Sequence, residues 1–263
     1  MKIQHKIDRD DLPGSRPEKQ WNRRAALNGL VLGGAAVALS SCSANTGSSQ
    51  VLAAGDPGAA VPAAPPGELP TTPEGALKRL LDGNQRLLAN KVLHAQTLDD
   101  IRRHATGQAP YAQVFGCADS RVPVEAVFDE DFGDIFVTRT AGNVLSDPTV
   151  GTIEYGVLEL KTPLVMVLGH QGCGAVKAAV AAMKEPAKTP PGPLGALVSA
   201  LVPGARQAQT RGGDAYAAAL EAHIRGVVAG LQETPSLKEK IAEGKLRVVG
   251  ASYDLATAKV TLY

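Results

Sequence analysis

Residues 164–174 read Leu-Val-Met-Val-Leu-Gly-His-Gln-Gly-Cys-Gly, an apolar run that ends at a glycine and is followed by a histidine and a cysteine. A short apolar run without polar alternation predicts a strand buried on both faces of a sheet. Residues 111–117 form a second such run, which leads into Cys117-Ala118-Asp119-Ser120-Arg121. Two buried strands that both end in reactive side chains indicate where a site would form.

The rest of the chain around these runs predicts an α/β fold. Further strands are expected over 134–140, 246–253 and 258–263. Helices are expected over 122–128, 149–160, 174–184 and about 214–231, and an earlier one starts at Thr71-Thr72-Pro73-Glu74. This alternation predicts a mostly parallel central β-sheet flanked by helices, with the last two strands forming an antiparallel edge hairpin at the C-terminus. The Pro/Gly/Ala-rich residues 185–213 predict an irregular excursion with at most a short helix.

The N-terminal residues 1–44 resemble an export signal. A charged segment ends in Arg23-Arg24, and an apolar run over 25–39 follows, which is shorter than the roughly 20 residues of a membrane span. Paired arginines at this place resemble a twin-arginine signal, which would deliver the protein to the periplasm, the extracellular space or the cell surface. The sequence before Cys42 also resembles a lipobox, in which Cys42 would carry a lipid anchor. The alternative is that Cys42 is discarded with a leader cut near Ala44.

Residues 45–70 consist mainly of small residues and proline, and they predict a flexible linker before one domain over 71–263. The formal net charge is +1 and no basic stripe is present, so the sequence gives no sign of nucleic-acid binding. The domain holds only two of the three cysteines, Cys117 and Cys173, which excludes a disulfide framework. A single disulfide between them remains an alternative for an exported protein.

The two strand endings together carry the pattern of a metal site. The carboxyl ends of parallel strands meet at one edge of a sheet, so Cys117, His170 and Cys173 are expected to converge there. Two thiolates and an imidazole suit zinc, and three protein ligands leave the fourth position open. Structural zinc sites are usually closed by four ligands, so this count favours a catalytic site over a structural zinc module that binds a partner.

CADSR (117–121) followed by HQGC (170–173) resembles the β-class carbonic anhydrases. The resemblance extends over residues 71–263 and includes FVTRTAGN (136–143) and TIEYGVLEL (152–160). It implies a lyase that binds one Zn²⁺ per subunit and reversibly hydrates carbon dioxide to bicarbonate and a proton by zinc-bound hydroxide. The implied zinc ligands are Cys117, His170 and Cys173.

The same resemblance implies a regulatory pair in Asp119 and Arg121. While Arg121 holds Asp119, the fourth zinc position is free for water, and when the pair breaks Asp119 becomes the fourth ligand of a closed state. A bidentate arginine is a suitable partner for a carboxylate beside Zn²⁺. Outside this motif, Asp119 would be interpreted as a helix N-cap and Arg121 as a member of a surface ion pair.

Three further residues resemble the substrate pocket of the plant-like branch of that class. Gln108 matches a glutamine that hydrogen-bonds substrate, and Phe136 and Tyr155 match apolar pocket residues that are partly supplied by a neighbouring subunit. The resemblance therefore implies a homodimer or homotetramer. The other branch has a tryptophan shortly before the first cysteine, where this chain has Val114-Phe115. The alternative to this pocket role is that Phe136 and Tyr155 are ordinary aromatic residues of the core.

Two other functions fit parts of the same pattern. Hydrolases of carbon disulfide or carbonyl sulfide keep the zinc triad, so the ligands do not exclude them. A non-catalytic zinc- or bicarbonate-binding protein would be expected to lack Asp119, Arg121 or a ligand, and all five positions are present. Two thiolate ligands make the site less electropositive than three histidines would, so the activity is expected to rise on the alkaline side.

Overall fold

The computed structural model describes residues 69–94, 96–209 and 213–263. The predicted leader, with Arg23, Arg24 and Cys42, and the linker up to residue 68 lie outside the described residues. Among the residues that are described, no helix combines the length and the apolarity needed to cross a membrane.

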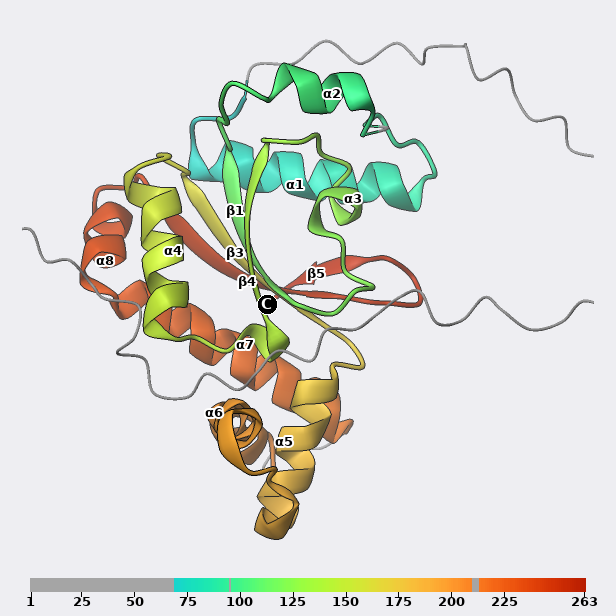
Figure 1. Ribbon diagram of the computed structural model, residues 1–263, viewed down its shortest axis with the longest axis vertical. Coiled ribbons are helices and arrows are strands. Elements are labelled where there is room, and N and C mark those ends of the chain that lie inside the picture. The colour runs from blue at the N-terminus through green and yellow to red at the C-terminus, as the bar shows by residue number, and fades with distance from the viewer. Residues whose placement is uncertain (1–68, 95, 210–212) are drawn as a thin grey trace, which may run out of the picture. The chain divides into compact units, whose positions relative to one another are not determined.

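Five strands form one sheet in the order β2-β1-β3-β4-β5 (Figure 1). The first four run parallel, and β5 pairs antiparallel with β4, which confirms the predicted sheet and its C-terminal hairpin. The strands are β1 (Ala112–Cys117), β2 (Ile135–Thr140), β3 (Leu164–His170), β4 (Arg247–Tyr253) and β5 (Val260–Leu262).

Helices cover both faces of this sheet (Figure 1). One apolar core lies between the sheet and α1 with α3, and a second lies between the opposite face and α4 to α8. The helices are α1 (Pro73–Leu88), α2 (Leu98–Arg103), α3 (Val124–Val127), α4 (Asp147–Leu158), α5 (Gly174–Lys184), α6 (Gly192–Ala208), α7 (Ala215–Glu233) and α8 (Pro235–Ala242), with 3₁₀ turns η1 (Ala141–Asn143) and η2 (Pro186–Lys188).

The prediction of an irregular excursion over 185–213 was wrong. Most of that segment is the 17-residue helix α6, which contains Pro203. Its buried side chains follow a helical period, and the contact with α5 and α7 stabilises a helix that its own composition disfavours. Its buried residues are Gly195, Val198, Leu201, Gly204, Ala205 and Ala208.

Other differences concern short elements. α2 and α8 were not predicted, and α3 has four residues where a helix over 122–128 was expected. The N-terminal boundary of α1 follows the prediction, because Thr72 is the N-cap and its hydroxyl accepts a hydrogen bond from the Gly75 N–H at 3.2 Å.

The order of the strands explains where a site can form. The chain leaves β1 toward β2 on one side and leaves β3 toward β4 on the other side, so the sheet has its topological switch point between β1 and β3. Ligand sites of open parallel sheets lie outside the carboxyl ends of the strands at such a point. All residues of β1 and β3 are buried, which fixes both strand ends firmly in the core.

Candidate metal centre

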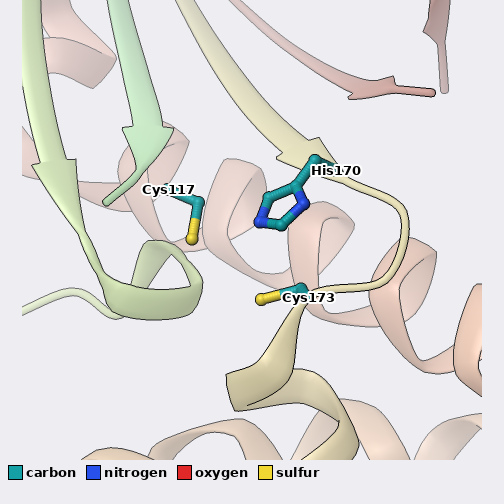
Figure 2. Close-up of side chains that lie close together, drawn as sticks. All are labelled: Cys117, His170 and Cys173. Carbon is teal, nitrogen blue, oxygen red and sulfur yellow. The ribbon is translucent and has the colours of Figure 1, made fainter. Parts of the chain in front are cut away.

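Cys117, His170 and Cys173 converge at the switch point, and Figure 2 shows their side chains directed toward one another. Cys117 is the last residue of β1, His170 is the last residue of β3, and Cys173 is the N-cap of α5. All three residues are buried, and their possible ligand atoms lie within 4.8 Å of one another. The structure thus brings together the three side chains that were predicted from the sequence to converge.

The His170 ring has the orientation of a metal ligand. Its Nδ1 lies 2.9 Å from the carbonyl oxygen of Gln171, which can only accept, so Nδ1 carries the proton and Nε2 has a free lone pair. Nε2 is buried and no described residue hydrogen-bonds it. A buried polar atom without a partner is costly, and a metal ion would satisfy it. A backbone carbonyl on the other ring nitrogen is also the usual outer partner of a metal-bound histidine.

The two cysteines are free thiols, so the alternative of a disulfide between Cys117 and Cys173 does not hold in this structure. A hydrogen bond from the Cys173 thiol to the Cys117 sulfur lowers the pKa of Cys117 to about 4, while burial opposes this shift and the Gly142 N–H assists it. The same hydrogen bond and burial raise the pKa of Cys173. Zinc binds cysteine as thiolate and would replace the proton between the two sulfurs. The donor set and its geometry therefore fit zinc.

Asp119 and Arg121 form the predicted pair beside these ligands. Arg121 Nε and Nη2 donate to the two carboxylate oxygens of Asp119 at 2.9 and 2.7 Å, and the Arg121 backbone N–H donates to Oδ1 at 3.0 Å. These bonds hold the pKa of Asp119 well below its usual range. The alternative role of Asp119 as N-cap is not observed, because Pro123 is the N-cap of α3.

Two residues that the sequence analysis left without a role hold the backbone around the centre. Arg139 donates from Nε to the Cys117 carbonyl at 2.8 Å and from Nη2 to the Asp119 carbonyl at 2.5 Å. Asn143 Nδ2 donates to the carbonyls of Phe115 and Leu168, at 2.8 and 3.2 Å, and so bridges β1 and β3 where they separate. Both residues lie in FVTRTAGN, and that segment was the available signal.

The structure of the single chain does not bring Gln108 to the metal ligands. Gln108 is exposed and precedes β1, whereas Cys117 ends it. At a rise of about 3.3 Å per residue, the six steps from Tyr111 to Cys117 span roughly 20 Å. Gln108 and Cys117 therefore lie at opposite ends of the strand.

Phe136 and Tyr155 also lie away from the centre of their own chain. Phe136 is level with Gln113 in the sheet, four residues before Cys117, which corresponds to roughly 13 Å along the strand. Its ring centroid lies 6.0 Å from that of Tyr155, and Tyr155 is 50% exposed on α4. Since β2 is an edge strand, this aromatic pair lies at a free side of the sheet and not in the core.

Comparison with known proteins identifies the family of the chain. Residues 112–260 match the family model described as carbonic anhydrase. Carbonic anhydrase 2 of Mycobacterium tuberculosis is 40% identical over 194 residues, which cover 73% of this chain and 93% of that protein. The carbonic anhydrase of Mycolicibacterium smegmatis is 40% identical over 197 residues, which cover 73% of this chain and 94% of that protein.

Solved structures agree with this assignment. The Coccomyxa β-carbonic anhydrase, in complex with acetazolamide, has a TM-score of 0.56 and 28% identity, and the match covers 71% of this chain and 85% of that one. A tetrameric β-carbonic anhydrase of Sordaria macrospora has a TM-score of 0.54 and 25% identity over 62% of this chain and 84% of that one. The chain therefore belongs to the carbonic anhydrase family of enzymes, and its fold is that of the β class.

Proposed function

We propose that this protein reversibly hydrates carbon dioxide to bicarbonate and a proton, with one Zn²⁺ per subunit held by Cys117, His170 and Cys173. The observation that carries the proposal is the buried Nε2 of His170, which no described residue hydrogen-bonds and which lies beside two free thiols. When bound, zinc acts as a Lewis acid that lets water lose a proton near neutral pH. The curated relatives named carbonic anhydrase support the choice of reaction.

The residues around the ligands have separable tasks in this proposal. Asp119 stays ionised, and its Oδ2 lies 3.7 Å from His170 Nε2, so it can accept a hydrogen bond from water at the centre. Arg121 holds both carboxylate oxygens and thereby keeps Asp119 from becoming a fourth ligand. Release of Asp119 from Arg121 would close the site.

The substrate pocket of the proposal needs a second subunit. Gln108, Phe136 and Tyr155 lie too far from the ligands of their own chain, so we assign them to the centre of a neighbouring copy that packs against the β2 edge. There Gln108 would donate to a substrate oxygen, and the aromatic pair would form the apolar wall beside carbon dioxide. This arrangement is the one expected of the plant-like branch, and a tetrameric relative supports assembly into a homodimer or homotetramer.

A hydration assay with a metal determination tests the proposal. The purified full chain is expected to contain about one zinc per subunit and to hydrate carbon dioxide in stopped-flow measurements, with the rate rising from pH 7 to pH 9. Cys173→Ser is expected to lose both zinc and activity. Zinc near zero, or zinc-loaded protein without hydration at pH 8.5, would contradict the proposal. Parallel assays with carbonyl sulfide and carbon disulfide distinguish a carbonic anhydrase from a hydrolase of these two compounds.

We also propose that the protein works outside the cytoplasm, after export directed by Arg23 and Arg24. The twin-arginine route carries folded proteins, so zinc would bind before transport and would protect both thiolates. Replacing both arginines by lysine is expected to leave the protein in the cytoplasm, as measured by fractionation of cells. Unchanged delivery would contradict this proposal. Labelling with a fatty-acid analogue, compared between the natural chain and Cys42→Ser, tests the lipid anchor.

A further inference from the structure

The turn Ala141–Asn143 contacts the metal ligand Cys117 through its backbone. The Gly142 N–H donates to Cys117 Sγ at 3.3 Å. Gly142 has φ +66°, and a Cβ at this position would lie 2.9 Å from Ala175 Cβ on α5 and 3.2 Å from a methyl group of Leu201 on α6. The close packing and the positive φ require glycine here. The position of the turn therefore determines the geometry of the hydrogen bond from the Gly142 N–H to Cys117 Sγ.

His223 of α7 holds the other side of the same residue. Its Nε2 lies 2.8 Å from the carbonyl oxygen of Gly142, and because that oxygen only accepts, Nε2 carries the proton. Burial lowers the pKa of His223 and so favours the neutral ring, although hydrogen bonds to the backbone of Gly142 and Asn143 oppose this shift. The backbones of α6 and α7 are in close contact at this position, since a Cβ at Gly204 would lie 2.9 Å from the Cα of His223. The hydrogen bond to Gly142 defines the tautomer of the ring, and the close contact of the two helices fixes the backbone that carries it.

We propose that His223 is a positioning residue for the metal ligand Cys117 and acts through Gly142. The two hydrogen bonds of Gly142 form a continuous connection from α7 to the sulfur: His223 donates to its carbonyl, and its N–H donates to Cys117. A hydrogen bond to a ligating thiolate withdraws electron density from the metal–sulfur bond and fixes the direction of the sulfur lone pairs. His223 thereby influences how firmly Cys117 holds the metal, without contact with the metal or the substrate.

The surroundings of His223 determine which substitutions are informative. A cavity of about 480 Å³ adjoins the ring and is lined by residues that include Val144, Leu145, Pro203 and Gly226. Water could fill the space left by alanine and donate to Gly142 in place of the ring. Leucine fills that space with apolar atoms, whereas glutamine places an amide nitrogen near the position of Nε2. Asparagine is polar but too short to reach the carbonyl.

The test compares zinc-loaded full chains that carry His223→Leu, His223→Gln or His223→Asn. His223→Leu and His223→Asn are expected to release zinc to a chelator about 10- to 100-fold faster than the natural protein, and His223→Gln to stay within about threefold. The sulfur-to-metal charge-transfer band of the cobalt(II) forms is expected to shift in the first two variants only. Gln232→Leu is the control, since it removes another donor of α7, from Gln232 Nε2 to the Val248 carbonyl on β4.

The measured release rates and spectra decide whether His223 positions Cys117. Natural release rates and spectra in both His223→Leu and His223→Asn would overturn it, and so would equal acceleration in His223→Gln or in the control. If His223→Leu fails to fold, the comparison of His223→Asn with His223→Gln gives the same decision. The inference rests on the zinc site of the proposed function. Release rates and spectra test it even if the zinc-loaded natural protein does not hydrate carbon dioxide.

Discussion

Arg121 binds both carboxylate oxygens of Asp119, with Nε and Nη2 at 2.9 and 2.7 Å, beside the cluster of Cys117, His170 and Cys173 that could hold a metal ion. Asp119 and Arg121 are only two positions apart in one loop, and Arg139 anchors that loop from β2 through the carbonyls of Cys117 and Asp119. Asp119 is therefore restrained twice: Arg121 binds its carboxylate, and Arg139 binds its backbone carbonyl.

Substitution of Arg121 is expected to lower activity without loss of metal. Arg121→Gln frees a carboxylate beside the centre, and Arg121→Lys keeps the charge but not the planar fork. We expect kcat/KM to fall at least about tenfold in both variants, measured by stopped flow at full zinc occupancy. Arg102→Gln removes an exposed ion pair with Asp99 on α2 and serves as the control.

The pH dependence of this effect follows from the pKa of Asp119. Because Arg121 lowers that pKa, the pair is complete above the ordinary carboxyl pKa of about 3.9 and is lost as the pH falls through the lower value of the folded protein. The defect of Arg121→Gln is therefore expected to be similar at pH 7 and pH 9. Natural activity of Arg121→Gln with zinc bound would contradict the role given to the pair.

Removal of the metal is expected to lower the melting temperature without unfolding the chain. Two of the proposed ligands, Cys117 and His170, end strands whose burial does not depend on the ion, since β1 and β3 pack between two apolar cores. Chelated protein should keep its far-ultraviolet circular dichroism, and added zinc should raise the melting temperature by mass action. Cys117→Ser is expected to show a much smaller rise. Loss of secondary structure on chelation would contradict this account.

The sheet and the convergence of Cys117, His170 and Cys173 could be predicted because the strands and their ends are marked in the local sequence. Continuous apolar runs identified β1 and β3, and the residues that follow them had to meet at one edge of the sheet. The helix α6 could not be predicted in this way. Its proline and glycine content disfavours a helix, and the decisive contribution is tertiary contact with α5 and α7.

The tasks of three residues around the ligands could not be predicted for a related reason. Arg139, Asn143 and His223 form hydrogen bonds to backbone carbonyls, and such bonds leave no spacing pattern; the segment FVTRTAGN indicated the first two residues but not what they bind. His223 is 53 residues from His170 along the chain (223 − 170 = 53) and belongs to an otherwise ordinary amphipathic helix. Only the packing of α7 against the turn at Gly142 gives it a role.

A buried ion network at the opposite end of the sheet provides a test of stability. Arg79 donates to Glu130 at 2.6 to 3.2 Å and to Asp134 at 2.7 Å, and the Glu130 side chain is 0% exposed. Arg79→Met leaves this carboxylate without its main partner, and we expect the free energy of unfolding to fall by about 3–5 kcal/mol at pH 7.5. Urea titration of the zinc-free protein measures it. Lys78→Met, which removes an exposed pair with Asp82, should cost about 0.5 kcal/mol or less.

The pH dependence of this loss has a definite sign. Burial raises the pKa of Glu130 although Arg79 opposes it, and without Arg79 the pKa rises further. The contribution of a carboxyl group to stability is fully present below the pKa that the group has in the unfolded chain, about 4.3, if its pKa is raised in the folded protein. That contribution is lost as the pH rises through the pKa of the folded protein. The difference between Arg79→Met and the natural protein should therefore shrink between pH 7.5 and pH 4.5. An equal difference in the free energy of unfolding at pH 7.5 and pH 4.5 would contradict this account of Glu130.

The last prediction concerns the source of the substrate pocket. Phe136 lies roughly 13 Å along the strand from the level of Cys117, and Tyr155 on α4 lies beside Phe136, so the proposed pocket forms only between subunits. A chain with Cys173→Ser has the aromatic pair but no metal. A chain with Phe136→Ala and Tyr155→Ala has the metal but no pocket. Each is expected to be nearly inactive alone.

Mixed dimers of these two chains are expected to regain activity, because one of their two sites combines an intact metal centre with an intact aromatic pair from the partner. If equal amounts assemble at random, half of the dimers are mixed and half of their sites are complete, so about a quarter of the natural activity should return. Each variant dissociated and reassembled by itself is the control. Absence of recovery in mixtures that form mixed dimers, or a monomeric protein with full activity, would show that the pocket belongs to the same chain as the metal.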